Sequence, residues 1–323
     1  MASPNTSFTE IITTTLENRS GKTADNVSKG NAILAQLKKK GAWKPATGRT
    51  IVQELEYSEG NFQWYSGYET ITITPPDVFT AAEYNWKQAA GSVSISGLEK
   101  DVQNTGKEAL INLMEARIKN AERTMKNQVC DGMYSDGTGT GGKEIGGLQL
   151  LIADDPTASS SVGGINQNTY SWWRNQTYDF STEATGGVAS ATTIQEGMNK
   201  LSLRCSRGGD QTDLIIMDDD YYGYFWASMQ TIQRVTDPDM AKLGFKNLMF
   251  GNAPVVYEDN TGMPDDHMYF INTDYLHFRY APDRLFKPSG SVRPANQDAE
   301  TVLVLFAGNL TCSNRSLQGV GKL

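Results

Sequence analysis

The sequence predicts an α+β fold, and three observations support this prediction. Helical and strand-like segments follow one another without the regular alternation that is typical of a parallel α/β sheet. A long amphipathic helix is predicted over residues 105–130, and a β-hairpin over residues 49–74. Short apolar runs that are typical of strands occur at residues 213–217, 254–257, 268–272 and 301–307.

Size and composition exclude several classes of protein. The chain has 323 residues and a formal net charge of −8, which allows about two domains and does not favour tight binding of nucleic acid. Three widely spaced cysteines, Cys130, Cys205 and Cys312, do not make a disulfide framework. Residues 1–18 lack a secretory signal pattern, and no apolar run has the length of a membrane helix. We expect a soluble protein, folded in a reducing cytoplasm, with no membrane partner.

Residues 1–48 are predicted to form an N-terminal arm. Phe8 and Ile12 belong to a short apolar stripe on a first helix, and a second helix is predicted over residues 25–40. Two short helices joined by Ser, Gly and Asn cannot bury a core alone, so the arm must lie on another surface. Phe8 and Ile12 are therefore candidate inter-subunit contacts.

The hairpin is predicted to have strands over residues 50–57 and 62–74, joined by a turn at residues 58–61 and ended by Pro75 and Pro76. It has one modest apolar face, and an isolated two-stranded hairpin is marginally stable in water. It must therefore be covered by its own chain or by a neighbour. Four aromatic residues near its tip are candidate inter-subunit contacts: Phe62, Trp64, Tyr65 and Tyr68.

Thr105 and Glu108 form a capping-box pattern at the start of the helix predicted over residues 105–130. Apolar residues then recur at spacings of three and four and form one continuous face: Leu110, Met114, Ile118, Ala121, Met125 and Val129. The opposite face carries Glu115, Lys119, Glu122 and Lys126. At a length on the order of 35 Å, this helix is suited to be the spine of the molecule.

Two further helices are predicted in the second half of the chain. Thr193 begins one of them, which is expected to end at Gly208 and Gly209. Asp218 is the predicted N-cap of an aromatic helix that extends to Met229. The three consecutive carboxylates of residues 218–220 suggest a metal site as an alternative. Consecutive side chains point in different directions, however, so the N-cap interpretation is favoured.

The segment from Gly137 to Lys143 matches most of a phosphate-binding loop pattern and also a dinucleotide-binding pattern. Both patterns require a strand before the loop and a helix after it, because the helix N-terminus must face the phosphate. Here a long helix precedes the loop, and Glu144 stands where a magnesium-binding Ser or Thr is needed. We therefore expect a flexible loop, with no nucleotide and no other cofactor.

Other candidate sites have simpler explanations. Lys38, Lys39 and Lys40 lie at a predicted helix C-terminus, where cations are favourable; weak contact with nucleic acid is the alternative. Trp172 and Trp173, like the aromatic run of residues 221–226, are more typical of a core or an interface than of a site that stacks sugars or bases.

Catalysis has no visible constellation of residues. The chain contains two histidines, His267 and His277, and neither belongs to a metal-ligating pair or lies near a cysteine in the sequence. The sequence also lacks the glycine-flanked serine of a nucleophile elbow. We therefore expect no enzyme activity, no catalytic residue and no metal.

The combination of arm, hairpin, spine helix and mixed remainder resembles the major capsid proteins of tailed bacteriophages, with the Hong Kong 97-type capsid fold. The resemblance covers nearly the whole chain. It depends on the hairpin with its aromatic segment at residues 62–69, on the spine helix, and on the loop at residues 135–143 that leads to Ile145-Gly-Gly-Leu148. The strand at residues 213–218 and the segment at residues 251–256 complete it.

The resemblance implies an organisation of the chain. Residues 1–48 would be the N-terminal arm and residues 49–74 the extended hairpin called the E-loop. Residues 75–192 would be the peripheral domain, including the spine helix, and residues 193–262 the axial domain. The C-terminal strands of residues 263–323 would return to the peripheral domain.

The resemblance also implies a function: a coat protein that self-assembles through pentamers and hexamers into an icosahedral shell around phage double-stranded DNA. Assembly would take place in the host bacterial cytoplasm, and the protein would reside in the virion. Portal, scaffold or decoration proteins are candidate partners, and packaged DNA is expected to make weak contacts only. Two alternatives stay open: an encapsulin-like, non-viral compartment and an aromatic-rich carbohydrate-binding module.

Overall fold

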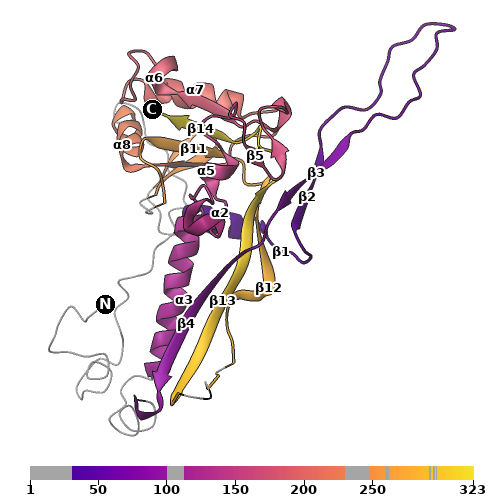
Figure 1. Ribbon diagram of the computed structural model, residues 1–323. Coiled ribbons are helices and arrows are strands. Elements are labelled where there is room, and N and C mark those ends of the chain that lie inside the picture. Colours follow the sequence, from indigo (N-terminus) through magenta and orange to yellow (C-terminus); the bar gives the residue numbers. More distant parts are fainter. Residues whose placement is uncertain are drawn as a thin grey trace.

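The computed structural model describes residues 31–99, 113–229, 247–258, 262–290, 292–293, 295 and 297–323. Its main strands form a four-stranded sheet beside a long helix and a six-stranded sheet beside shorter helices (Figure 1). A loop projects far from this body between β2 (Ile51–Glu56) and β3 (Phe79–Tyr84). The predicted α+β class is confirmed.

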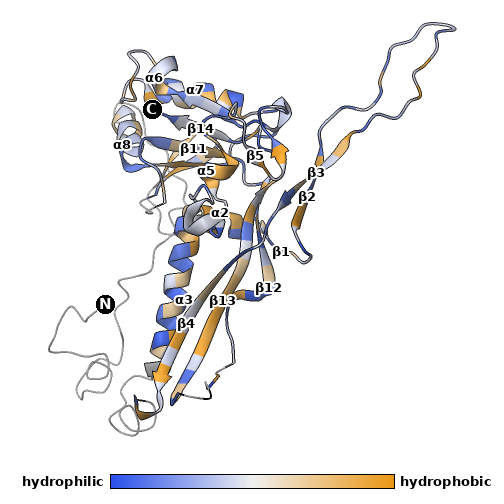
Figure 2. Cartoon of the chain, viewed as in Figure 1, coloured by the Kyte–Doolittle hydropathy of each residue, from blue (hydrophilic) through white to orange (hydrophobic). Residues whose placement is uncertain are grey.

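The four-stranded sheet has the strand order β1-β12-β13-β4. Its bounds are Trp43–Pro45 for β1, Leu276–Pro288 for β12, Ala299–Cys312 for β13 and Lys87–Ser96 for β4. β1 runs parallel to β12, whereas the other neighbours are antiparallel. Hydrophobic residues recur along β4 and β13 (Figure 2), where Val93, Val304 and Phe306 are buried.

The long helix is α3 (Leu113–Gly132), and it packs beside β4. Met125 and Val129, on its predicted apolar face, are buried, whereas Lys126 is exposed. The helix lies close to the sheet at Gly91, where an added Cβ would be 3.4 Å from Met125 Cε. The sequence period therefore identified correctly the face that packs against the sheet.

The start of the predicted helix lies outside the described residues, because residues 100–112 are not described. Its capping pair, Thr105 and Glu108, falls in this gap. The side chains of Met114 and Glu115 also lie outside the described part. The prediction is confirmed from Leu113 onward, and the helix ends at Gly132 instead of residue 130.

The six-stranded sheet has the order β7-β14-β11-β8-β10-β9. In this order the strands are Gln176–Asp179, Gly319–Lys322, His267–Ile271, Leu214–Met217, Ala253–Tyr257 and Asn247–Phe250. β7 is parallel to β14 and β8 is parallel to β10, whereas the other pairs are antiparallel. The strands predicted at residues 213–217, 254–257 and 268–272 are confirmed.

The central strand β8 is buried on both faces, which explains its uninterrupted apolar sequence. Leu214 and Ile216 belong to the larger core, which also contains residues of the four-stranded sheet. Ile215 and Met217 face a second core under the helices. The six-stranded sheet therefore separates two cores.

Four helices accompany this sheet: α5 (Leu148–Leu151), α6 (Phe180–Glu183), α7 (Ile194–Arg204) and α8 (Asp219–Ser228). α7 ends at Arg204, four residues earlier than the sequence predicts. It lies directly on β14, where a Cβ added to Gly319 would be 2.5 Å from Cys205 Sγ. No helix among the described residues has the length and apolar character needed to span a membrane.

Short elements complete the described fold. They are α2 (Ala32–Lys39), α4 (Gly139–Gly142), the 3-10 helix η3 (Ser171–Trp173), β5 (Ser161–Val162) and β6 (Ile165–Asn166). α2 confirms the described part of the second predicted helix. Asn31 caps it, because Leu34 N donates a hydrogen bond of 2.9 Å to Asn31 Oδ1.

The strands after residue 262 divide between the two sheets. β12 and β13 lie in the four-stranded sheet, whereas β11 and β14 lie in the six-stranded one. The sequence-based expectation placed residues 263–323 together in one unit, and the positions of β11 and β14 differ from it. The reason is long-range pairing: β11 pairs with β8, and β14 lies between β7 and β11.

Candidate assembly surface

The most exposed segment of the described chain is the loop of residues 57–78, which we call the projecting loop. At its base, β2 and β3 pair with each other, and Ile51, Leu55 and Ala82 are buried against the body. The ring of Tyr57 stacks on Trp172 with centroids 5.6 Å apart. Beyond this anchor the loop extends away from the rest of the molecule (Figure 1).

The predicted strand pairing of the hairpin is wrong. β2 pairs with residues 79–84, not with residues 62–74, and Tyr57 N donates to Val78 O at 3.0 Å. This register places Tyr57 opposite Val78, so the tight turn predicted at residues 58–61 does not form. Ile51 and Leu55 of β2 are buried, and so are Ala82 and Tyr84 of the partner strand β3. Both strands therefore bury side chains against the rest of the molecule.

The two limbs of the projecting loop are joined by side chains instead of a strand ladder. Gln63 Nε2 donates to Thr70 O at 3.1 Å, and Thr72 N donates to Gln63 Oε1 at 3.1 Å. Asn61 Nδ2 also donates to Thr74 O. These bonds hold the limbs near each other but leave most backbone groups of the loop open to solvent or to a partner.

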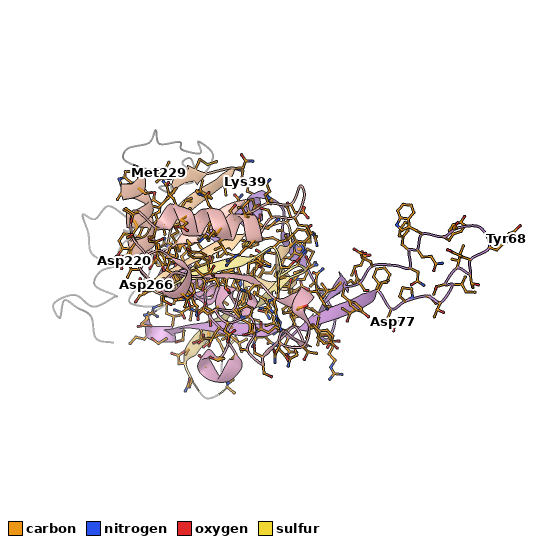
Figure 3. All side chains as sticks on the ribbon, turned by 90° about the horizontal axis from the view of Figure 1, so that it is seen from above. Lys39, Tyr68, Asp77, Asp220, Met229 and Asp266 are labelled. Atoms are coloured by element: carbon orange, nitrogen blue, oxygen red, sulfur yellow. The ribbon has the colours of Figure 1, made fainter. Side chains whose placement is uncertain are left out.

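The four aromatic candidates all lie exposed on this loop. The exposed fractions are 77% for Phe62, 89% for Trp64, 63% for Tyr65 and 108% for Tyr68. The rings of Phe62 and Trp64 contact edge to face, with centroids 5.2 Å apart. Figure 3 shows Tyr68 at the far end of the loop, away from the body. Large exposed aromatic residues gathered in this way are typical of an interaction surface.

The other two candidate contacts, Phe8 and Ile12, lie in residues 1–30, outside the described residues. Their assignment stays a prediction.

The glycine-rich loop does not have the geometry of a phosphate-binding loop. α3 precedes it where a strand is required, and α4 is a single short turn with left-handed backbone at Thr140 (φ 51°). Lys87 Nζ donates a hydrogen bond to Gly142 O. The loop therefore presents a carbonyl oxygen to the ammonium group of Lys87.

We expect that Lys143→Ala will leave nucleotide binding undetectable, as in the unmodified protein, and assembly unchanged. Lys143 is exposed, so its truncation is expected to change the stability of the fold little. The measurement is a thermal melt of both proteins with and without ATP or GTP. A nucleotide-dependent rise in melting temperature that the substitution abolishes would contradict this interpretation.

The carboxylates of residues 218–220 act as a helix cap. Asp218 accepts hydrogen bonds from Tyr221 N at 2.9 Å and from Asp266 N at 2.5 Å, which confirms it as the N-cap of α8. Burial raises the pKa of Asp218 to about 6, although both backbone hydrogen bonds oppose this. Among the described residues, no three His, Cys, Asp or Glu side chains gather as a metal site would require.

The lysine run also has a structural explanation. Lys40 pairs with Asp213 and with Asp274, the latter at 2.9 Å. It thereby ties the end of α2 to the six-stranded sheet. Lys38 and Lys39 lie in the last turn of α2, where cations are favourable.

Most of the aromatic residues that suggested a carbohydrate-binding site lie inside the protein. Trp173 is 1% exposed, and its Nε1 donates to Val162 O at 3.0 Å. Tyr221 and Phe225 are buried in the second core. Trp172 packs between Tyr57 and Trp173. Trp173, Tyr221 and Phe225 are therefore packing residues, whereas Trp226, at the end of the same run, is 38% exposed.

The reactive side chains are buried or engaged. Cys130, Cys205 and Cys312 are buried free thiols, and burial raises the pKa of Cys205 and of Cys312 to about 12. These two thiols are therefore protonated and unreactive at neutral pH. His267 Nε2 lies 3.2 Å from Asp154 Oδ2.

Sequence reasoning missed Arg315, which is fully buried between β13 and β14. Its guanidinium donates to two backbone oxygens, Leu151 O at 2.6 Å and Trp173 O at 3.1 Å. It also donates to Gln167 Oε1 at 2.9 Å and to Asn175 Oδ1 at 3.2 Å. Nothing in the local sequence marks this arginine, because its partners lie about 140 to 164 residues away.

Comparison with known proteins identifies the chain. The family model of the SU10 major capsid protein matches residues 86–314. No curated protein sequence shows a significant match.

The fold is similar to solved capsid structures at low sequence identity. The capsid subunit of cyanophage A-1(L) is 14% identical, with a TM-score of 0.70 over 94% of this chain and 95% of that one. A structure from Mycobacterium phage Adephagia is 10% identical, with a TM-score of 0.59 over 97% and 96% of the two chains.

The SrpI encapsulin of Synechococcus elongatus also shares the fold, at 10% identity and a TM-score of 0.54 over 93% and 91% of the chains. Fold similarity at this identity does not separate a phage head from a compartment, but the family match does. The chain belongs to the SU10 major capsid protein family, has the Hong Kong 97-type capsid fold and is a coat protein of a tailed-phage head shell.

Proposed function

We propose that the projecting loop is the element by which each coat subunit holds a neighbouring copy, with Phe62, Trp64, Tyr65 and Tyr68 as its contact residues. The observation that carries this proposal is the exposure of these four aromatic side chains on a segment that leaves its own body. Aromatic residues dominate the energetics of protein interfaces. A monomer that kept them in water would gain nothing from their apolar area.

The proposal extends to the domains. The four-stranded sheet with α3 corresponds to the peripheral domain, and the six-stranded sheet with its helices corresponds to the axial domain. In this assignment the axial domain also includes β7, β11 and β14. Residues 1–48 remain the proposed N-terminal arm, with Phe8 and Ile12 as contacts.

The assembly we propose consists of pentamers and hexamers of this chain that close into an icosahedral shell around double-stranded DNA. The net charge of −8 favours weak contact with packaged DNA over tight binding. The subunit is a structural protein without catalysis, assembled in the cytoplasm of a host bacterium. Portal, scaffold or decoration proteins are further candidate partners.

We expect that Trp64→Ala will leave the subunit folded and reduce shell formation. Trp64 is 89% exposed, so its removal takes little from the stability of the subunit. Loss of an aromatic anchor at an interface costs about 2–4 kcal/mol at each contact. The measurement compares the melting temperature of the unassembled subunit with the particle yield seen by negative-stain microscopy.

Trp173→Ala is the matched control, because Trp173 is the same residue type at 1% exposure. It is expected to lower the free energy of unfolding by about 3–5 kcal/mol. If Trp64→Ala unfolded the subunit as Trp173→Ala does, the loop would be a folding element and the interface role would be wrong. Nuclease-protected DNA in purified particles tests the proposal that the shell encloses double-stranded DNA.

A further inference from the structure

The projecting loop and its two flanking strands carry charge of one sign only. Between Thr50 and Trp86 the sequence contains no Lys or Arg. It contains six carboxylates, all exposed: Glu54, Glu56, Glu59, Glu69, Asp77 and Glu83. Glu69 lies near the tip, and one of its oxygens accepts a hydrogen bond of 2.9 Å from Ser66 N. A surface that receives this loop must therefore tolerate negative charge.

A group of basic side chains lies where the chain enters β2. Lys44 on β1 is in register with Arg279 on β12, so the two lie side by side. Arg279 and Arg49 line a cavity of about 450 Å³ formed by residues 45–52. Burial lowers the pKa of His277, two residues before Arg279, to about 4, and the charges of Lys44 and Arg279 lower it further. We call Lys44, Arg49 and Arg279 the basic pocket.

One hydrogen-bond donor in this pocket lacks a partner. Arg279 Nη2 donates to Gln53 Oε1 at 3.3 Å, whereas its Nε is buried with no partner. Within the described ranges, no carboxylate forms an ion pair with Lys44, Arg49 or Arg279.

The nearest acidic influence on His277 comes from Asp274, which already pairs with Lys40 at 2.9 Å. A buried N–H group without an acceptor is costly. An incoming anion would accept from Arg279 and neutralise a cluster that repels itself. Lys44 and Arg49 are exposed, so such an anion has access.

We propose that the basic pocket binds carboxylates of the projecting loop of a second copy, with Glu69 at the tip as the first of them. The proposal rests on the proposed function of the loop and adds the surface that receives it. The loop cannot serve its own pocket, because Tyr68, beside Glu69, lies far out from the body (Figure 3). A tip-to-base contact is head-to-tail, and repeating it around an axis closes a ring.

The experiment uses two complementary charge reversals in the full chain. The pocket-reversed variant is Lys44→Glu with Arg49→Glu, and the loop-reversed variant is Glu59→Lys with Glu69→Lys. All four side chains are exposed, so the subunit should fold. The matched control is Lys38→Glu with Lys143→Glu, which changes the net charge as the pocket-reversed variant does but lies outside the pocket. Particle yield is measured by sedimentation and microscopy, and subunit folding by thermal melts.

Each reversed variant alone is expected to lose particle yield by about tenfold or more, because like charges then face each other across the contact. A single chain that carries all four reversals is expected to recover the yield, because each tip then meets a pocket of opposite sign in a ring of five or of six. The control should assemble as the unmodified chain does. Recovery in the chain with all four reversals is the result that an attraction between loop and pocket produces.

The proposal is overturned if the chain with all four reversals assembles as poorly as the two separate variants, or if the control loses as much as the pocket-reversed variant. It is also overturned if pocket reversal leaves particle number unchanged and lowers only the DNA that the particles retain, since the pocket would then be a phosphate site. These failures leave the loop proposal intact if Trp64→Ala still reduces shell formation. Failure of the unmodified chain to form particles would instead refute the proposed function.

Discussion

Replacing Arg315 with methionine is expected to lower the free energy of unfolding by about 3–5 kcal/mol. The guanidinium is fully buried and its plane lies over Trp173, 5.8 Å from the ring centroid. Burial lowers the pKa of Arg315 to about 10, so the group remains charged at neutral pH. Methionine fills a similar volume but leaves the oxygens of Leu151, Trp173 and Gln167 without donors inside the protein.

The measurement is denaturant unfolding of the full chain. Arg207→Met is the control, because Arg207 is exposed and its ion pair with Asp210 spans 3.6 Å. This control should change stability by less than about 1 kcal/mol. Equal losses for the two substitutions would show that the buried network around Arg315 is not what joins this part of the fold.

Met125→Asp is the second substitution with a large expected effect. Met125 lies on the face of α3 that packs against β4 and is 5% exposed. Burying an unpaired carboxylate at such a position costs several kcal/mol. We expect a loss of about 3–5 kcal/mol, observed as unfolded or insoluble protein. This tests the same helix face as Met114, whose side chain lies outside the described residues.

Gln128→Asp is the matched control for this substitution. Gln128 lies on the same helix, three residues later, and is exposed. The same aspartate there should cost less than about 1 kcal/mol, mainly through its lower helix propensity. If both variants failed to fold, the cost would come from the helix backbone, and the assignment of the buried face would be wrong.

The sequence predicted those parts of the fold in which local pattern and burial agree. The spacing of apolar residues identified the buried face of α3, and the run at residues 214–217 identified a strand buried on both sides. Asp218 was recognisable as a cap because capping depends on a few neighbouring residues. Each of these features depends on residues that are close to one another in the sequence.

The sequence failed where a structure depends on distant partners. Residues 62–74 alternate as a strand does, but the side chains that pair with β2 are those of Ala82 and Tyr84, which can bury against the body. Alternation alone does not show which segment finds a buried surface. For the candidate site, the aromatic residues were found by composition. The basic pocket was missed because Lys44 and Arg279 meet only through the pairing of β1 with β12.

The position of β14 inside the six-stranded sheet constrains how the protein is made. Among the described strands, β14 separates β7 from β11, so β7 pairs with none of them until residues 319–322 have left the ribosome. A nascent chain therefore carries an unfinished sheet with an open edge until these residues emerge. Completion of the subunit is thereby delayed until translation has passed residue 322. A partly synthesised chain therefore lacks the completed fold that incorporation into a growing particle requires.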